Sequence, residues 1–86
     1  MVTEMYVPAR PNVIPLSQAP TGSKVRVINV VGGKYRVQKI FDMGLTPGVE
    51  AFVRQNIYYG PVIVDVRGVT IAVGRGIAEG ILVEII

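Results

Sequence analysis

The strongest constraint on the fold is a series of short segments in which apolar residues alternate with other residues. Glycine or proline lies between most of these segments and the next. Alternation with a period of two is typical of β-strands that bury one face, and glycine and proline are typical of the turns between strands. The pattern predicts five strands, over residues 24–31, 49–54, 62–67, 69–74 and 81–86.

One segment between the first two of these strands has a different period. Apolar residues recur at spacings of three and four after Lys34, at Val37, Ile40 and Phe41. This spacing predicts an amphipathic helix of two to three turns. Gly44 is placed to end the helix in a left-handed conformation, and Leu45 follows where such an ending places an apolar contact. Residues 46–48, Thr-Pro-Gly, then predict a type II turn.

The chain has 86 residues, which is enough for one domain. Short strands must curl if they are to bury one apolar face and limit exposed edges. We therefore expect an all-β fold, a small five-stranded β-barrel with one short helix between the first and second strands. Its buried core is expected to be aliphatic and to include Val25, Val27, Leu45, Val53, Val64, Ile71 and Val83.

The first fifteen residues differ from the rest of the chain, because they contain three prolines and little periodicity. Proline lacks an N–H donor and restrains the residue before it. We expect a flexible N-terminal arm over residues 1–15 and the globular domain over residues 16–86. If the arm is ordered, Met5, Tyr6 and Val7 are expected to lie against a neighbouring subunit, and self-association into a homo-oligomer is left open.

The chain contains no histidine and no cysteine. Their absence removes the usual general base, the commonest transition-metal ligand and all thiol chemistry. The six carboxylates are scattered along the sequence, whereas a hard cation prefers several oxygen ligands that arrive together. We therefore expect no catalytic residues, no dedicated metal site and no cofactor, and we reject an enzymatic function.

Charge and hydropathy bear on the location of the protein. Uncharged runs such as residues 55–64 and 68–74 are shorter than the roughly 20 residues that a membrane-spanning helix needs. The N-terminus carries Glu4 and lacks the pattern of a signal peptide. We expect a soluble, cytoplasmic protein. The net charge of +3 comes from basic residues that are spread along the domain.

Several motifs together resemble one family. The most specific is the segment 42–48, Asp-Met-Gly-Leu-Thr-Pro-Gly. Weaker matches occur in the same order and spacing as in FeoA domains, at residues 15–17, 22–27, 60–61, 66–68 and 78–81. Over about residues 16–84 the chain resembles the FeoA family, and the same module is similar to the C-terminal SH3-like domain of iron-dependent DtxR-type repressors. The resemblance implies an SH3-like barrel and a non-catalytic accessory role in ferrous iron uptake. It also implies a cytoplasmic partner, the FeoB-type membrane transporter.

The predicted turn after residue 54 carries the candidate site. A hairpin tip is normally polar, yet Ile57, Tyr58 and Tyr59 follow one another here. Exposed apolar patches mark interfaces, and tyrosine is enriched in interface hot spots. We interpret these residues as partner-binding, although one tyrosine folded back over the barrel end would explain them equally well. The helix adds Arg36 and Lys39 as candidate contacts, and Leu45 after it is a further candidate.

Binding of nucleic acid is the alternative function. Small SH3-like barrels bind RNA, and residues 25–34 loosely resemble a KOW-type turn. Such a site usually concentrates basic residues on one face. Here the basic residues are few and dispersed, so no nucleic-acid partner is expected.

Overall fold

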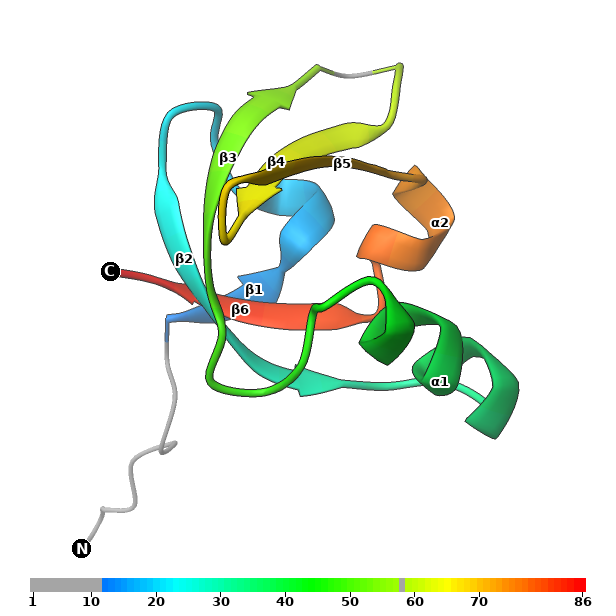
Figure 1. Ribbon diagram of the computed structural model, residues 1–86. Helices are drawn as coiled ribbons and strands as arrows, with labels where there is room; N and C mark the ends of the chain where they lie inside the picture. The colour runs from blue at the N-terminus through cyan, green and yellow to red at the C-terminus, as the bar shows by residue number, and fades with distance from the viewer. Residues whose placement is uncertain (1–11, 58) are drawn as a thin grey trace, which may run out of the picture.

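The computed structural model describes residues 12–57 and 59–86, and Figure 1 shows the arrangement of their helices and strands. One antiparallel sheet of six strands curves around a single core, with a 3-10 turn and two helices beside it. In chain order the elements are β1 (Val13–Pro15), η1 (Leu16–Gln18), β2 (Lys24–Val30), α1 (Lys34–Asp42), β3 (Glu50–Asn56), β4 (Val62–Val66), β5 (Val69–Val73), α2 (Arg75–Ala78) and β6 (Ile81–Ile85).

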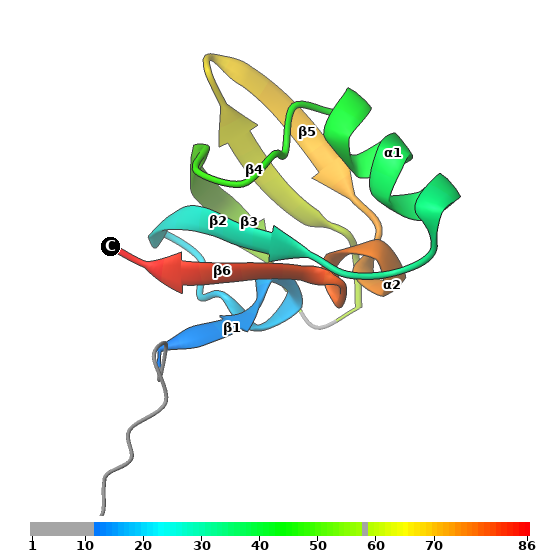
Figure 2. The same ribbon diagram turned by 90° about the horizontal axis from the view of Figure 1, so that it is seen from below.

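The strands lie in the order β1-β6-β2-β3-β4-β5, and Figure 2 shows the sheet from below. The predicted count of five strands is wrong by one, because β1 adds a sixth. Val13, Ile14 and Pro15 pair with Glu84, Val83 and Leu82 of β6. Residues 13–15 therefore belong to the sheet and not to an arm, and proline is tolerated there because β1 is an edge strand. Residues 1–11 of the predicted arm lie outside the described residues.

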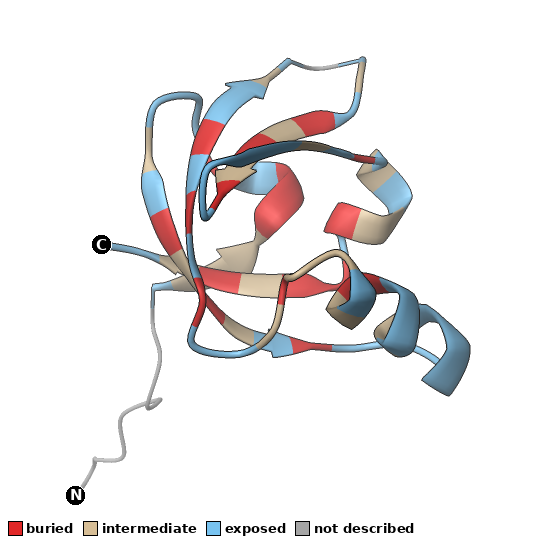
Figure 3. Ribbon diagram, viewed as in Figure 1, coloured by how far each residue is buried: buried red, intermediate tan, exposed pale blue. Residues whose placement is uncertain are grey.

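The core is aliphatic, as predicted, and Figure 3 shows the buried residues as bands along the strands. The predicted core residues Val25, Val27, Leu45, Val53, Val64 and Val83 are all buried. Ile71 is the exception, since it packs against the core but is only partly buried. The reason is its place in β5, which has a neighbouring strand on one side only within the described part of the chain.

A β-bulge in β2 changes the predicted orientation of one residue. Strict alternation places Val30 on the same face as Arg26. In the structure the pairing with β6 shifts between Val27 and Asn29, and Val30 is buried while Asn29 is exposed. The extra residue of a bulge resets the alternation and bends the strand. A second shift, between Val53 and Gln55 in β3, has the same effect on the curvature of the sheet.

The end of α1 follows the prediction in detail. Gly44 has a φ of 91°, and its N–H donates to the carbonyl of Phe41 at 2.9 Å, while the N–H of Leu45 donates to the carbonyl of Ile40 at 3.3 Å. These two bonds define a Schellman motif. The turn that follows has Gly48 at a φ of 93°. This corner carries Leu45 into the core, where its side chain is 1% exposed.

The short helix α2 is followed by a close approach between two backbones. The N–H of Val31, just after β2, donates to the carbonyl of Gly80 at 2.8 Å. A Cβ atom on Gly80 would lie 2.6 Å from the carbonyl oxygen of Val31. Only glycine fits at this position, which joins the end of β2 to the start of β6.

Candidate partner-binding surface

The connection between β3 and β4 forms a tip at one end of the molecule, at the top of Figure 1. Ile57 is 51% exposed and Tyr59 is 91% exposed. Tyr58, the third predicted contact, lies outside the described residues. Two large side chains of the predicted site therefore reach solvent together.

A single arginine from another part of the chain holds the base of this tip. Arg75, the first residue of α2, donates through Nε to the carbonyl of Gly60 at 3.2 Å. Its Nη2 atom donates to Asn56 Oδ1 at 2.7 Å and also to the carbonyl of Ile57. Both sides of the tip are thus bonded to one guanidinium group, whose five donors in a fixed fork suit several acceptors at once.

The same guanidinium connects the tip to the N-terminal 3-10 turn. Arg75 Nη1 donates to the carbonyl of Ser17 at 3.1 Å. Asn56 Nδ2 donates to that carbonyl at 2.9 Å and to the carbonyl of Ala19 at 2.6 Å. Ser17 Oγ in turn donates to Glu79 Oε2 at 3.1 Å. The tip is therefore fixed to η1 and α2, and a hollow lies between these elements, lined by Ser17, Gln18, Asn56, Ile57, Arg75 and Glu79.

Arg75 and Asn56 were not predicted from the sequence as part of the site. Arg75 lies between two glycines, a pattern that indicates a turn and nothing about its partners. Three of its four acceptors are backbone carbonyls, and every residue of a protein has a carbonyl. No sequence signal would have revealed this anchor.

The remaining predicted contacts lie elsewhere. Arg36 and Lys39 are exposed on α1. Figures 1 and 2 both show α1 and the tip well apart, and α2 lies between them in Figure 1. Leu45 is buried in the core, so its side chain forms no part of a surface. The structure thus separates two candidate surfaces, the tip and the outer side of α1.

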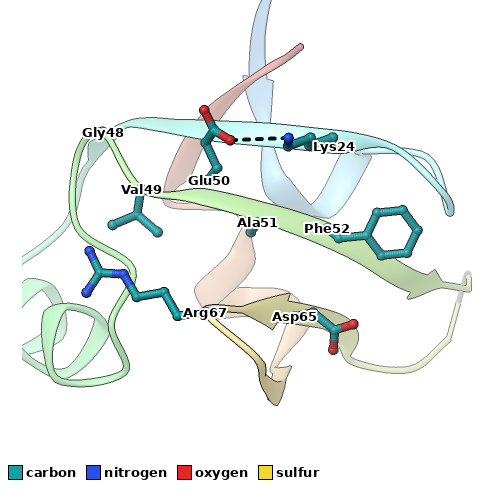
Figure 4. Close-up of a pocket in the computed structure, with 8 residues that line it drawn as sticks. All are labelled: Lys24, Gly48, Val49, Glu50, Ala51, Phe52, Asp65 and Arg67. Carbon is teal, nitrogen blue, oxygen red and sulfur yellow. Dashed lines mark ion pairs between the residues drawn. The ribbon is translucent and has the colours of Figure 1, made fainter.

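The outer face of the sheet carries a third feature, the depression in Figure 4, where the ion pair between Lys24 and Glu50 is drawn. Glu50 lies 3.4 Å from Lys24 Nζ and 3.1 Å from Arg26 Nη2. The hydrogen bond from Arg26, followed by that from Lys24, lowers the pKa of Glu50. The single carboxylate of Glu50 therefore pairs with two basic side chains of the same face.

Asp65, on the same face, also has two donors. Thr70 Oγ1 donates to Asp65 Oδ1 at 2.7 Å, and Arg54 Nε lies 2.6 Å from Asp65 Oδ2. The pKa of Asp65 is lowered, first by the Thr70 hydrogen bond and then by Arg54. Hydrogen bonds to the charged form of a carboxyl group stabilise that form and lower its pKa.

Replacing Thr70 with valine is expected to raise the pKa of Asp65 toward its ordinary value, because the larger of the two lowering hydrogen bonds is lost. Thr70→Ser keeps the hydroxyl group and should leave the pKa low. A pH titration of the Asp65 carboxyl carbon by NMR measures both. An equal pKa in the valine and serine variants would show that Arg54 alone sets it.

The described residues offer no obvious metal centre or membrane segment. Within residues 12–57 and 59–86, no group of three or more histidine, cysteine, aspartate or glutamate side chains is placed to hold a metal ion. In the same part of the chain, no helix is long and apolar enough to cross a membrane.

Comparisons with known proteins give a consistent picture. A family model described as the FeoA domain matches residues 14–85. The protein "Putative Fe(2+) transport protein A" of Methanocaldococcus jannaschii is 39% identical over 70 residues, which cover 81% of this chain and 84% of that protein.

Solved structures extend the comparison to three dimensions. The crystal structure of an iron uptake regulatory protein, FeoA, matches with a TM-score of 0.82 at 40% identity, over 86% of this chain and 99% of that chain. The crystal structure of IdeR from T. acidophilum matches with a TM-score of 0.78 at 19% identity, over 96% of this chain and 37% of that chain. The IdeR likeness shows the fold alone. The predicted SH3-like fold is confirmed.

Proposed function

The chain belongs to the FeoA family of ferrous iron transport proteins, and from this premise we propose that it is a non-catalytic accessory of Fe²⁺ uptake. It acts in the cytoplasm by binding the cytoplasmic part of a FeoB-type transporter. The Ile57–Tyr59 tip is the contact surface, and binding biases transport or nucleotide turnover by the transporter.

The observation that supports this proposal is the combination of exposure and anchorage at the tip. Ile57 and Tyr59 are exposed, while the backbone on both sides of them is bonded to Arg75. A surface that is ordered before binding loses less conformational entropy when it binds. Tyrosine is also enriched among the residues that dominate binding energy at interfaces.

The proposal is tested by replacing Ile57, Tyr58 and Tyr59 together with serine. The barrel should remain folded, because Ile57 and Tyr59 contribute little to the core. Binding to the cytoplasmic domain of the cognate transporter should weaken at least about tenfold, since truncating a hot-spot aromatic costs roughly 2 kcal/mol or more. Calorimetry with the purified domain, with and without guanine nucleotide, measures the affinity.

The matched control is Tyr35→Ser on α1. Tyr35 is 83% exposed, so its loss removes a comparable aromatic side chain from the other candidate surface. If the tip variant binds the transporter domain normally and the Tyr35 variant binds it weakly, the contact surface lies on α1, where Arg36 and Lys39 are exposed. Salt-sensitive binding of RNA, with no affinity for the transporter, would favour the nucleic-acid alternative.

A further inference from the structure

Strand β5 forms one edge of the sheet, and it is unusually open. Within residues 12–57 and 59–86, only β4 pairs with it. Its sequence, Val-Thr-Ile-Ala-Val over residues 69–73, carries no charge and no proline. Natural proteins usually protect an edge with charges, proline, a bulge or a cover, because unpaired backbone groups invite pairing with another chain.

The β4–β5 hairpin determines which backbone groups of β5 are unpaired. Arg67 and Gly68 have φ values of 52° and 81°, and Val66 pairs with Val69 across them. In a two-residue hairpin of this kind the closing pair is hydrogen-bonded, and bonded pairs then alternate along the strands. The N–H and C=O groups of Thr70 and Ala72 therefore point away from β4.

The opposite edge of the sheet is protected in the usual way. Strand β1 has only three residues, and the last of them is Pro15. A short strand that ends in proline offers little backbone for pairing. The asymmetry between the two edges indicates that β5 is left open for a partner strand.

We propose that residues 2–7 of a second copy of this chain pair with the open edge of β5. This segment, Val-Thr-Glu-Met-Tyr-Val, is free of glycine and proline and is rich in residues that favour strands. Its six residues are enough to pair along all five residues of β5, and Pro8 follows directly. Addition of an extended segment to an exposed sheet edge is a common recognition mode, in which main-chain hydrogen bonds supply affinity.

Side chains also fit this occupant. Val69 is 59% exposed and Ile71 is only partly buried, so the core-facing side of β5 is incompletely covered. In an extended segment 2–7, Met5 and Val7 share one face. Placed beside β5, that face would continue the apolar surface of the sheet past its present edge.

The reach of the chain favours a second copy over the same molecule. Figure 2 shows β1 and β5 on opposite sides of the sheet, with β6 and β2 between them. Five strand spacings, each about 4.8 Å, separate the two edges along the sheet, roughly 24 Å in all. The linker of residues 8–12 spans at most about 17 Å when fully extended. A linker of this length that follows the surface of the curved sheet therefore does not bring the segment to its own β5.

Pairing of β5 with β5 of the second copy fits less well. In such a dimer, the N–H and C=O groups of Thr70 and Ala72 that point away from β4 would bond in both copies. This requires an antiparallel register in which Ile71 lies opposite Ile71 of the second copy. That register brings the β4–β5 turn of each copy, which carries Arg67, close to the start of α2 of the other copy, which carries Arg75. Segment 2–7 brings a single charge, the acidic Glu4, and so creates no repulsion beside Arg67.

The proposal is tested first by comparing the full chain with residues 12–86. Sedimentation should show a concentration-dependent dimer for the full chain and a monomer for the truncated one. Hydrogen exchange at the amides of Thr70 and Ala72 should slow as the concentration of the full chain rises, and should stay fast in the truncated chain. A dimer of residues 12–86, a full chain that stays monomeric at millimolar concentration, or protection that is independent of concentration would each overturn the proposal.

A pair of variants separates loss of pairing from loss of folding. Ala72→Pro removes the outward N–H donor but leaves the bonds to β4, because proline is tolerated on the open side of an edge strand. It should raise the dimer dissociation constant about tenfold or more. Ala72→Ser keeps the donor and should leave the constant unchanged. If the proline variant unfolds, a second experiment takes its place, in which a peptide of residues 1–11 is added to the 12–86 chain. The NMR signals of the Thr70 and Ala72 amides should then shift, and unchanged signals would count against the proposal.

Discussion

Replacing Arg75 with alanine is expected to weaken transporter binding about as much as removing the tip side chains, although Arg75 itself is only partly exposed. The variant leaves the carbonyls of Gly60, Ile57 and Ser17 and the side-chain oxygen of Asn56 without their shared donor. Loss of a charged donor to several acceptors costs roughly 2 kcal/mol of unfolding free energy. The larger effect falls on the tip, which loses its support and must be ordered again on binding.

Two measurements separate these effects. Urea unfolding reports the global stability, and hydrogen exchange at residues 57 and 60 reports the order of the tip. Arg54→Ala is the matched control, because it removes an exposed arginine whose ion pair with Asp65 lies on the outer face of the sheet. Arg54→Ala should change neither tip exchange nor transporter affinity. Slow exchange at the tip of the Arg75 variant would contradict the anchoring role of Arg75.

Among the described glycines, Gly80 is the one whose replacement by alanine is expected to destabilise the fold most. The new Cβ would lie 2.6 Å from the carbonyl oxygen of Val31. That oxygen is part of the backbone and cannot rotate away, so the end of β2 must move relative to β6. Overpacking of this kind costs roughly 3 kcal/mol, and a loss of that size lowers the melting temperature by more than about 10 °C in a domain of this length.

Gly76→Ala provides the contrasting case. Gly76 lies in α2, and a Cβ added there meets nothing within 4 Å. Alanine is the better helix former, so this variant should be neutral or more stable by up to about 1 kcal/mol. Thermal unfolding of both variants compares them directly. Equal melting temperatures would mean that the contact between Gly80 and Val31 relaxes at no cost.

Local patterns were predicted well because their causes lie within a few residues. The corner formed by Gly44 and Gly48 depends on helix-ending and turn bonds between near neighbours, and both glycines have the expected positive φ. The buried valines of β4 follow from alternation alone, since this strand contains no bulge. The family resemblance rested on the same corner, and it is confirmed.

Features that depend on distant pairing were not predicted. Strand β1 has three residues and no visible alternation, and it exists because β6 pairs with it. The bulge at Ile28 has no mark in the sequence. At the tip, exposure of Ile57 and Tyr59 was expected, whereas the network around Arg75 joins residues 15 to 58 positions apart in the chain. Of the predicted contacts, Ile57 and Tyr59 are exposed and Leu45 is buried, and the bonds that hold the tip were not predicted.

The position of β6 has a consequence for the kinetics of folding. Although β6 is the last of the six strands in the chain, it lies inside the sheet, between β1 and β2. Val25 and Ile85, which pair across β2 and β6, are far apart in sequence, so closing the barrel carries a large loop entropy. During synthesis on the ribosome, β1 has no strand to join until β6 has emerged. High contact order of this kind is typical of domains that fold in milliseconds to seconds. The barrel can therefore close only after the whole domain has been synthesised, and its N-terminal part cannot form the barrel alone.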